Sequence, residues 1–281
     1  MGEQEKSNNL KEDNNIKEEK KKGKKTSKEI IRKIIFMISL CVFVYSAVNL
    51  FFIVRDYYEN YKYYSALQKE YAPTMVDEDA GRRYVMDPLK FDELKNKNED
   101  FKGWITVENT TANYPIMQYE DNDYYLTHCL DKYVLNGGSI FLGANNNDDF
   151  NDRNTTIHGH HMKNGSMFGQ LYKYKWKGLF SREYDFFNNN KIVYISTRDH
   201  TYEYEIFSVY VEKVSNAPYK NRFEKDEDYL NFLKGLKEKS LVQNDDIKEF
   251  TPNDKIVTLS TCDYSMDDGR LLIHAKLIKS E

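Results

Sequence analysis

The longest apolar stretch of the chain runs from Ile34 to Val54 and contains no charged residue. A helix of that length, rising about 1.5 Å per residue, reaches across a hydrocarbon core of roughly 30 Å. A buried helix of a globular domain would present a polar face, and this stretch has none. Because no small-residue cleavage motif follows it, we expect an uncleaved transmembrane signal-anchor over residues 34–54.

Basic residues are distributed unequally on the two sides of this stretch. Lys17–Lys33 holds nine Lys or Arg against three Glu, whereas residues 55–70 hold three Lys or Arg. The more basic flank stays in the cytoplasm. We therefore expect a single-pass protein of the cell membrane with an extracytoplasmic C-terminal part. Residues 1–33 form a Lys-rich cytoplasmic tail, and we expect its first 28 or so residues to be disordered because they carry almost no apolar side chains.

The pattern changes again after the apolar stretch. We expect a helical stalk or linker over residues 55–84 and a folded domain over 85–281, which opens with a short helix. From Trp104 onward, short apolar runs are broken by Asn, Asp and Gly, which is typical of strands joined by turns. We predict strands at 104–107, 113–118, 138–143, 154–160, 191–197, 201–214, 255–262 and 270–278, and helices at about 166–175 and 226–238. Many short strands with few helices predict a mainly β fold, a small closed barrel.

Charge and cysteine content narrow the classes of function. The net charge is −4, so the whole chain carries no basic signature for binding nucleic acid. The three cysteines, Cys41, Cys129 and Cys262, cannot form a disulfide framework, and no Cys/His spacing indicates structural zinc. We expect no nucleic-acid partner, no metal and no cofactor, and at least one thiol that is unpaired within the chain.

The last two predicted strands place a thiol beside a guanidinium. In KIVTLSTCD, strict alternation puts Thr258, Ser260 and Cys262 on one face, opposite an apolar face. In GRLLIHAKLI, Arg270 likewise lies opposite the apolar face. A short connection, Asp263–Gly269, makes the two strands an antiparallel hairpin. If both apolar faces look into the barrel, Cys262 and Arg270 share one outer patch.

The segment NTTIHGHHM supplies a candidate base. With Ile157 facing the core, His158 and His160 face outward together, and His161 faces the other way unless Gly159 bends the strand. A thiol with a pKa near 8.5 is only a few per cent ionised at neutral pH, so a neutral imidazole that exchanges its proton would activate Cys262. Arg270 stays protonated, and its natural role is to stabilise an oxyanion.

At these residues the chain resembles the sortases, and class B in particular. The family signature TLxTC followed by Arg is present as Thr258–Cys262 with Arg270, and the family's GH dipeptide is present as Gly159-His160. Further class B features follow in order: GWI at Gly103–Ile105, YPIMQ at Tyr114–Gln118, DNDYYL at Asp121–Leu126, GSIF at Gly138–Phe141 and SMFGQL at Ser166–Leu171. The resemblance covers about residues 85–281, and an N-terminal anchor is also typical of the family.

The resemblance implies an eight-stranded sortase barrel and a membrane-anchored cysteine transpeptidase, a thiol endopeptidase of the EC 3.4.22 type in a Gram-positive envelope. Cys262 would attack the carbonyl of the Thr in a C-terminal sorting signal of a surface protein and hold that protein as a thioester. An amino group of a peptidoglycan precursor would then accept it. His160 and Arg270 complete the catalytic set. The substrate-binding positions implied by the match are Asn122, Leu126, His158, Ser260 and Asp263, with His158 standing where the family commonly has Tyr.

Other interpretations of the same residues remain open. Cys262 could be a small buried apolar residue, and His158 with His160 could be two metal ligands on one strand face. The acidic loop with Asp148, Asp149 and Asp152 could bind calcium or form a solvated turn. We expect His128, His200 and His274 to be surface or hydrogen-bonded residues. For the whole protein, the alternatives are a thiol hydrolase that transfers to water and a non-catalytic envelope-binding module.

Overall fold

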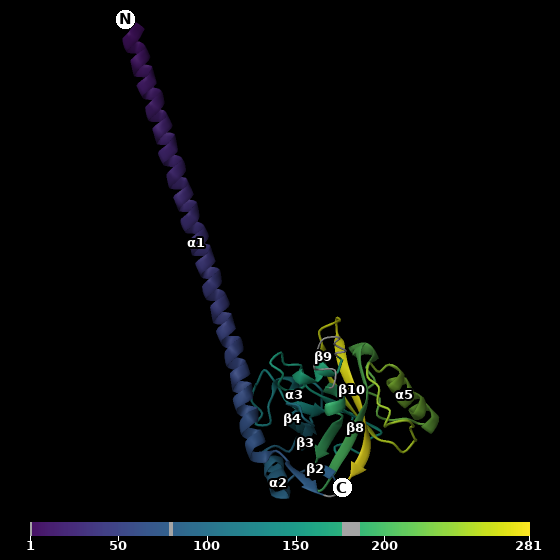
Figure 1. The fold of residues 1–281 in the computed structure, drawn as a ribbon. Helices are drawn as coiled ribbons and strands as arrows, with labels where there is room; N and C mark the ends of the chain where they lie inside the picture. Colours follow the sequence, from purple (N-terminus) through teal and green to yellow (C-terminus); the bar gives the residue numbers. More distant parts are fainter. Residues whose placement is uncertain (1, 79–80, 176–185) are drawn as a thin grey trace. The chain divides into compact units, whose positions relative to one another are not determined.

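The computed structural model describes residues 2–78, 81–175 and 186–281 (Figure 1). The chain divides into two compact units, Met1–Arg55 and Asp56–Glu281. Helix α1 spans Gly2–Tyr71 and contributes to both units. The second unit holds all the strands that the structure describes.

The first unit is the N-terminal part of α1. Its side chains from Ile34 to Val54 are exposed, and the stretch Lys28–Tyr71 is long and apolar enough, by length and composition, to cross a membrane. The structure differs from our expectation at the N-terminus, because α1 is helical from Gly2 onward where we expected disorder. Lys and Glu dominate this segment. Both residue types are good helix formers, so a low apolar content does not prevent a helix.

Residues 56–71 of α1 pack into the second unit and do not form a free stalk. Tyr64, Leu67 and Tyr71 are buried within the hydrophobic core of that unit. The Tyr64 hydroxyl donates to the carbonyl of Gly138, and Gln68 Nε2 donates to the carbonyl of Asn113 at 2.7 Å. The folded unit therefore begins near residue 56, about thirty residues before the boundary that we expected at 85.

The predicted stalk is helical only as far as Tyr71. Pro73 follows, and it can neither donate a backbone hydrogen bond nor continue a helix. The chain then forms the antiparallel pair β1 (Thr74–Glu78) and β2 (Gly81–Val85). The predicted short helix follows as α2 (Pro88–Lys97), whose first turn is capped by the Asp87 carboxylate accepting from Leu89 N at 2.9 Å.

Eight strands close into a barrel in the order β10-β8-β7-β3-β4-β5-β6-β9. This confirms the predicted fold class, and each of the eight predicted strands lies within a few residues of its expected place. The strands are β3 (Phe101–Val107), β4 (Asn113–Met117), β5 (Ile140–Leu142), β6 (Asn154–His158), β7 (Ile192–Ser196), β8 (Thr201–Lys213), β9 (Ile256–Asp263) and β10 (Gly269–Ser280).

Short helices connect the strands. The predicted helix at 226–238 is α5 (Asp226–Glu238), and the one predicted at 166–175 is a shorter 3-10 helix, η1 (Gly169–Lys175). Among the described residues there are also α3 (Tyr124–Thr127), α4 (Phe186–Asn189) and η3 (Val214–Asn216).

Two apolar clusters hold the barrel together. Inward-facing side chains such as Val257, Leu259 and Ile273 belong to the main core. A second cluster lies on the outside of β8, β9 and β10, where Leu233 and Leu236 of α5 pack with outward-facing side chains of these strands. Figure 1 shows α5 alongside β8 and β10. The helix thus covers part of the outer wall of the barrel.

Candidate active site

The β9–β10 hairpin brings Cys262 and Arg270 together. The two strands pair in antiparallel register, and Arg270 lies directly opposite Cys262. Val257 and Leu259 on β9, and Leu271 and Ile273 on β10, are buried in the main core. Because side chains alternate along a strand, Cys262 and Arg270 both face outward. The predicted sharing of one face by the thiol and the guanidinium is confirmed.

His160 follows the strand next to this hairpin. β6 pairs in parallel with β9, and its last paired residue, His158, lies opposite Ser260. At Gly159, just past the paired part of this strand, an added Cβ would lie 2.4 Å from Ile140 Cδ1, so a side chain there would require its neighbours to shift. The next residue, His160, has its Nε2 at 2.7 Å from the carbonyl oxygen of Leu126. Since a carbonyl only accepts, Nε2 carries a proton in this arrangement.

These side chains line one cavity of about 280 Å³ on the outer wall of the barrel. We call it the groove; it is lined by Asn122, Asp123, Leu126, Phe141, His158, Gly159, His160, Val214, Tyr219, Ser260, Thr261, Cys262 and Arg270. All three residues predicted to be catalytic are in this set. Four of the five predicted substrate-binding residues, Asn122, Leu126, His158 and Ser260, are in it as well. The Cys262 and Arg270 side chains are half-buried, so the groove is sheltered but open to solvent.

Asp263 is the predicted substrate-binding residue that does not line the groove. Its side chain is fully buried and forms an ion pair with Lys175, and it also accepts from Ser265. Burial acts to raise the pKa of Asp263, but the hydrogen bonds from Lys175 and Ser265 outweigh it and hold the pKa below its ordinary value. The physical reason for the difference is strand alternation, which turns the residue after Cys262 away from the groove.

His158 lines the groove and packs against two aromatic rings. Its ring stacks on Phe141 with centroids 5.2 Å apart and meets the Tyr219 ring edge-on at 5.2 Å. Desolvation by these neighbours, together with the nearby charge of Arg270, lowers the pKa of His158 to about 4. The imidazole is therefore uncharged at neutral pH.

Two contacts of groove residues could not be predicted from the sequence. The Tyr219 hydroxyl lies 2.7 Å from Ser260 Oγ, and His161 Nδ1 lies 2.9 Å from the carbonyl oxygen of Cys262. Tyr219 comes from the long connection between β8 and β9, and no periodicity fixes where such a connection packs. His161 was visible in the sequence only as a neighbour of His160.

The remaining cysteines lie outside the groove. Cys129 is fully buried and Cys41 lies in the apolar part of α1.

The remaining histidines are also outside it. His128 stacks on Tyr124 and His200 is exposed. His274 is fully buried and hydrogen-bonded to Thr258, with 2.9 Å between Nδ1 and Oγ1.

The acidic loop is occupied by internal contacts. Asp148 pairs with Lys102, Asp149 accepts from the backbone of Asn151, and Asp152 accepts from Asn146 and Asn147. Among the described residues, no three His, Cys, Asp or Glu side chains are grouped so that they could hold a metal ion. No third ligand therefore joins His158 and His160 within this part of the chain.

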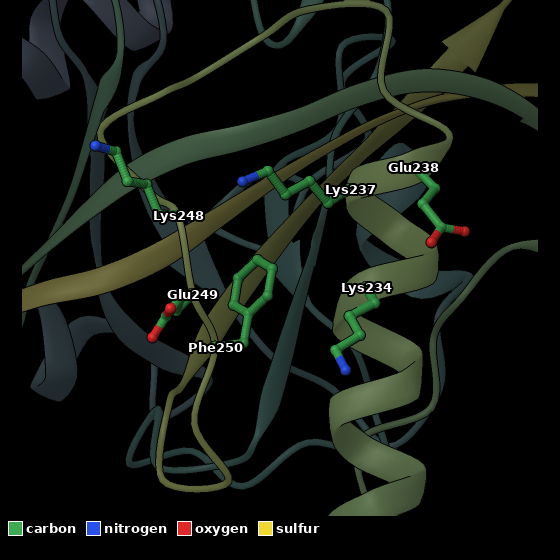
Figure 2. Close-up of a pocket in the computed structure, with 6 residues that line it drawn as sticks. All are labelled: Lys234, Lys237, Glu238, Lys248, Glu249 and Phe250. Carbon is green, nitrogen blue, oxygen red and sulfur yellow. The ribbon is translucent and has the colours of Figure 1, made fainter.

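A larger cavity, of about 540 Å³, lies between α5 and residues 248–250 (Figure 2). We call it the lysine cavity; it is lined by Lys234, Lys237, Glu238, Lys248, Glu249 and Phe250. Figure 2 shows the Phe250 ring lying between residues 248–250 and α5. The Glu238 side chain points away from this ring. The cavity contains no thiol and no histidine, so size does not identify the candidate active site.

Fold and groove together define a class: a closed β-barrel protein with the groups needed for thiol-based acyl transfer. The comparisons with known proteins agree with this class. Residues 105–278 match the family model of the sortase domain. The chain is 33% identical over 255 residues to sortase B of Listeria monocytogenes, an alignment that covers 89% of this chain and 98% of that protein. The chain therefore belongs to the sortase family, class B, and is a cysteine transpeptidase.

Solved structures give the same result. The crystal structure of sortase B from Bacillus anthracis in complex with AAEK1 matches with a TM-score of 0.65 and 37% identity, covering 80% of this chain and 99% of that one. A Staphylococcus aureus sortase B–substrate complex matches with a TM-score of 0.61 and 28% identity, covering 79% of this chain and 92% of that one.

Proposed function

We propose that this transpeptidase cleaves a C-terminal sorting signal after a Thr residue and joins the protein to an amino group of a peptidoglycan precursor. In this proposal Cys262 is the nucleophile, His160 the acid/base and Arg270 the oxyanion stabiliser. The observation that carries it is the meeting of these three side chains in one groove, with Cys262 and Arg270 paired across neighbouring strands.

The first half-reaction forms a thioester. Cys262 loses its proton to His160, and Sγ attacks the Thr carbonyl to give a tetrahedral intermediate. The Arg270 guanidinium, which has only N–H donors, donates to the oxyanion. The C–N bond then breaks, His160 returns the proton to the leaving amine, and the N-terminal part of the substrate remains on Sγ.

The second half-reaction resolves the thioester. An acceptor amine attacks the same carbonyl and gives up a proton to His160, and the C–S bond breaks to return the thiol. The hydrogen bond between His160 Nε2 and the Leu126 carbonyl orients the ring and leaves Nδ1 as the nitrogen free to exchange protons. In both half-reactions, every proton and bond is accounted for by Cys262, His160, the substrate and the amine.

We propose that the groove binds the sorting signal as an extended peptide. Asn122, Leu126, His158 and Ser260 form its polar and apolar walls. The substrate complex solved for the Staphylococcus aureus protein supports the choice of a peptide ligand. Asp263 has no proposed contact with the signal, because its carboxylate is used by Lys175 and Ser265.

We propose that the enzyme is held in the cell membrane by residues 34–54, with residues 1–33 in the cytoplasm and the barrel outside. The apolar part of α1 and the concentration of Lys before it support this topology. The partners would then be surface proteins that carry a sorting motif, and the amine of the peptidoglycan precursor. Peptidase activity of the EC 3.4.22 type would be the outcome when water replaces the amine.

The test is turnover by the full chain in detergent micelles. The substrates are a library of short fluorogenic peptides with Thr fixed at the cleavage position, with hydroxylamine as a small amine acceptor. We expect cleavage and a hydroxamate product, and loss of both in Cys262→Ala. Normal turnover by that variant would overturn the proposal. Cleavage without any amine-containing product would identify a thiol hydrolase, and no cleavage by the wild-type chain would favour a binding module.

A further inference from the structure

The parallel pairing of β6 with β9 stops just before Cys262. The last backbone hydrogen bond between the two segments runs from Gly159 N to the Ser260 carbonyl, at 3.1 Å. In a regular parallel ladder the next bond would come two residues further along both chains, from His161 N to the Cys262 carbonyl. The pairing of the two strands ends at His158 and Ser260, and the backbone of His161 forms a bridge with Met167. The His161 side chain makes the bond instead, with 2.9 Å between Nδ1 and the Cys262 carbonyl oxygen.

Several contacts fix the His161 imidazole in this place. Its ring lies beside Tyr172, with centroids 5.8 Å apart and planes inclined by 13°, and beside Tyr264 at 5.1 Å. The Tyr264 hydroxyl donates to the His161 carbonyl at 3.3 Å. The backbone of His161 also forms a bridge with Met167. The ring that reaches Cys262 is therefore held by two aromatic neighbours, and the main chain of His161 is held as well.

The direction of this hydrogen bond is set by chemistry. A carbonyl oxygen only accepts, so His161 Nδ1 must carry the hydrogen. Both the neutral Nδ1–H tautomer and the imidazolium can donate from this atom, so the bond does not depend on the charge of the ring. A side chain that carries an N–H at the same position can replace it.

We propose that His161 is a positioning residue, which holds the Cys262 carbonyl and thereby aims Sγ at the groove. The proposal rests on the proposed role of Cys262 as nucleophile. His161 is one residue from His160, so its bond to Cys262 joins the segments of the acid/base and the nucleophile directly. A reacting atom displaced by about 1 Å can lose about 100-fold in rate. A fixed carbonyl on the nucleophile itself limits such displacement.

His161 does not compete with His160 for the acid/base role. His160 lines the groove together with Cys262, whereas His161 is absent from the groove lining. The Nδ1 atom of His161 is also committed to a main-chain acceptor. The two neighbouring histidines thus have separate tasks in the proposal, one chemical and one structural.

The test compares three substitutions in the full chain. In His161→Asn, the amide nitrogen takes the place of Nδ1, so this variant should keep kcat within about 3-fold of the wild type. His161→Gln carries the same amide one methylene further out, and His161→Ala has no donor. For both of these we expect kcat to fall by about 10- to 100-fold while KM changes by less than about 3-fold. His200→Ala, at an exposed position, is the matched control and should behave as the wild type.

Restoration by Asn, but not by Gln, separates positioning from general stability, because both amides have the same polarity. Melting temperatures of the four variants are measured alongside, so that an unfolded His161→Ala does not decide the outcome. Equal activity of the Asn and Gln variants, or equal loss in both, would overturn the proposal. The failure would be distinct from failure of the proposed function, which is decided by Cys262→Ala and leaves the comparison of Asn with Gln untouched.

Discussion

The two ends of the outer face of β9 and β10 differ in their exposure to solvent. At one end, Cys262 and Arg270 are half-buried in an open groove. At the other end, Thr258 and His274 face the same way but are fully buried beside the cluster that α5 completes. Both ends carry a nucleophilic or titratable group on the same face of the same hairpin. Whether a group on this face can react therefore depends on whether other side chains bury it, and not on its residue type alone.

At the covered end, hydrogen bonds join Thr258, His274 and Asn154, while His274 Nε2 has no hydrogen-bond partner among the described residues. Thr258 Oγ1 donates to Asn154 Oδ1 at 2.6 Å and accepts from His274 Nδ1 at 2.9 Å. The Asn154 amide in turn donates to the carbonyls of Pro218 and Lys220, on either side of Tyr219. The chain of bonds therefore ends at the segment that carries a wall of the groove. The two ends differ in solvent exposure, but both contact the segment around Tyr219.

The largest effect is expected at the open end, for Arg270→Ala. Removing one donor to an oxyanion lowers the rate by about 100- to 1,000-fold. Arg270→Lys is the matched control, because it keeps the charge and loses the planar pair of donors; it should recover only part of the rate. Measurement of kcat/KM for both variants checks this expectation. Full activity of Arg270→Ala would remove the guanidinium from the mechanism.

At the covered end we expect a loss of stability without a loss of chemistry. Truncation of a buried side chain in His274→Ala should lower the free energy of unfolding by about 2–4 kcal/mol. The kcat of the folded fraction should stay within about 2-fold of the wild type, since His274 lies outside the groove. Chemical denaturation and turnover at low temperature provide the two measurements. A selective drop in kcat would mean that the covered end takes part in the reaction.

Two buried histidines, His274 at the covered end and His158 in the groove, make the stability depend on pH. Burial lowers the pKa of His274 to about 3, with a smaller contribution from Lys239, and desolvation lowers that of His158 to about 4. The unfolded chain, with histidine pKa values near 6.5, binds more protons than the folded chain between about pH 6.5 and 4. Stability should therefore fall as the pH is lowered through that window, and less steeply in His274→Ala. Denaturation midpoints that do not change over this range would contradict the assignment.

A smaller effect is expected where the two ends meet, at Tyr219. Its hydroxyl lies 2.7 Å from Ser260 Oγ, and such a bond contributes about 1 kcal/mol. Tyr219→Phe should lower kcat/KM by about 5-fold, a factor that corresponds to that energy. Ser260→Ala should have a similar effect, and the double variant should cost no more than either alone. Additive losses would show that the two hydroxyls act separately.

The smallest effect is expected in the lysine cavity of Figure 2. Lys248→Ala should change neither kcat/KM nor the free energy of unfolding by more than about 0.5 kcal/mol, as is usual for exposed positions. Lys234→Ala is a second variant of the same kind. A clear loss of turnover in either would connect this cavity to the groove, which nothing in its lining suggests.

The sequence predicted the open end better than the covered one. Alternation in the last two strands placed Cys262 and Arg270 on one face, because strand periodicity is a local property that tertiary packing preserved. The same alternation puts His274 on that face, but alternation alone does not predict that α5 and its neighbours bury this end. Asp263 was assigned to the substrate by resemblance, whereas alternation turns it toward Lys175.

Long-range packing also explains the differences elsewhere. From its sequence, the part of α1 after residue 56 was predicted to be a stalk. The few apolar residues that it buries are mixed with exposed tyrosines such as Tyr58 and Tyr61, so no clear apolar face is visible. The role of Tyr219 depends on where a long connection returns to the barrel, and the contact of His161 depends on where the chain after β6 ends its pairing with β9. None of these follows from local periodicity.

A covalent intermediate on Cys262 in the groove can be detected by intact-mass spectrometry. The full chain in detergent is mixed with the Thr-containing peptide library and quenched within seconds. We predict an added mass equal to the N-terminal part of a cleaved peptide, removed by hydroxylamine and missing in Cys262→Ala. A chain that cleaves peptide yet never carries this mass, or carries it equally in Cys262→Ala, would contradict the account.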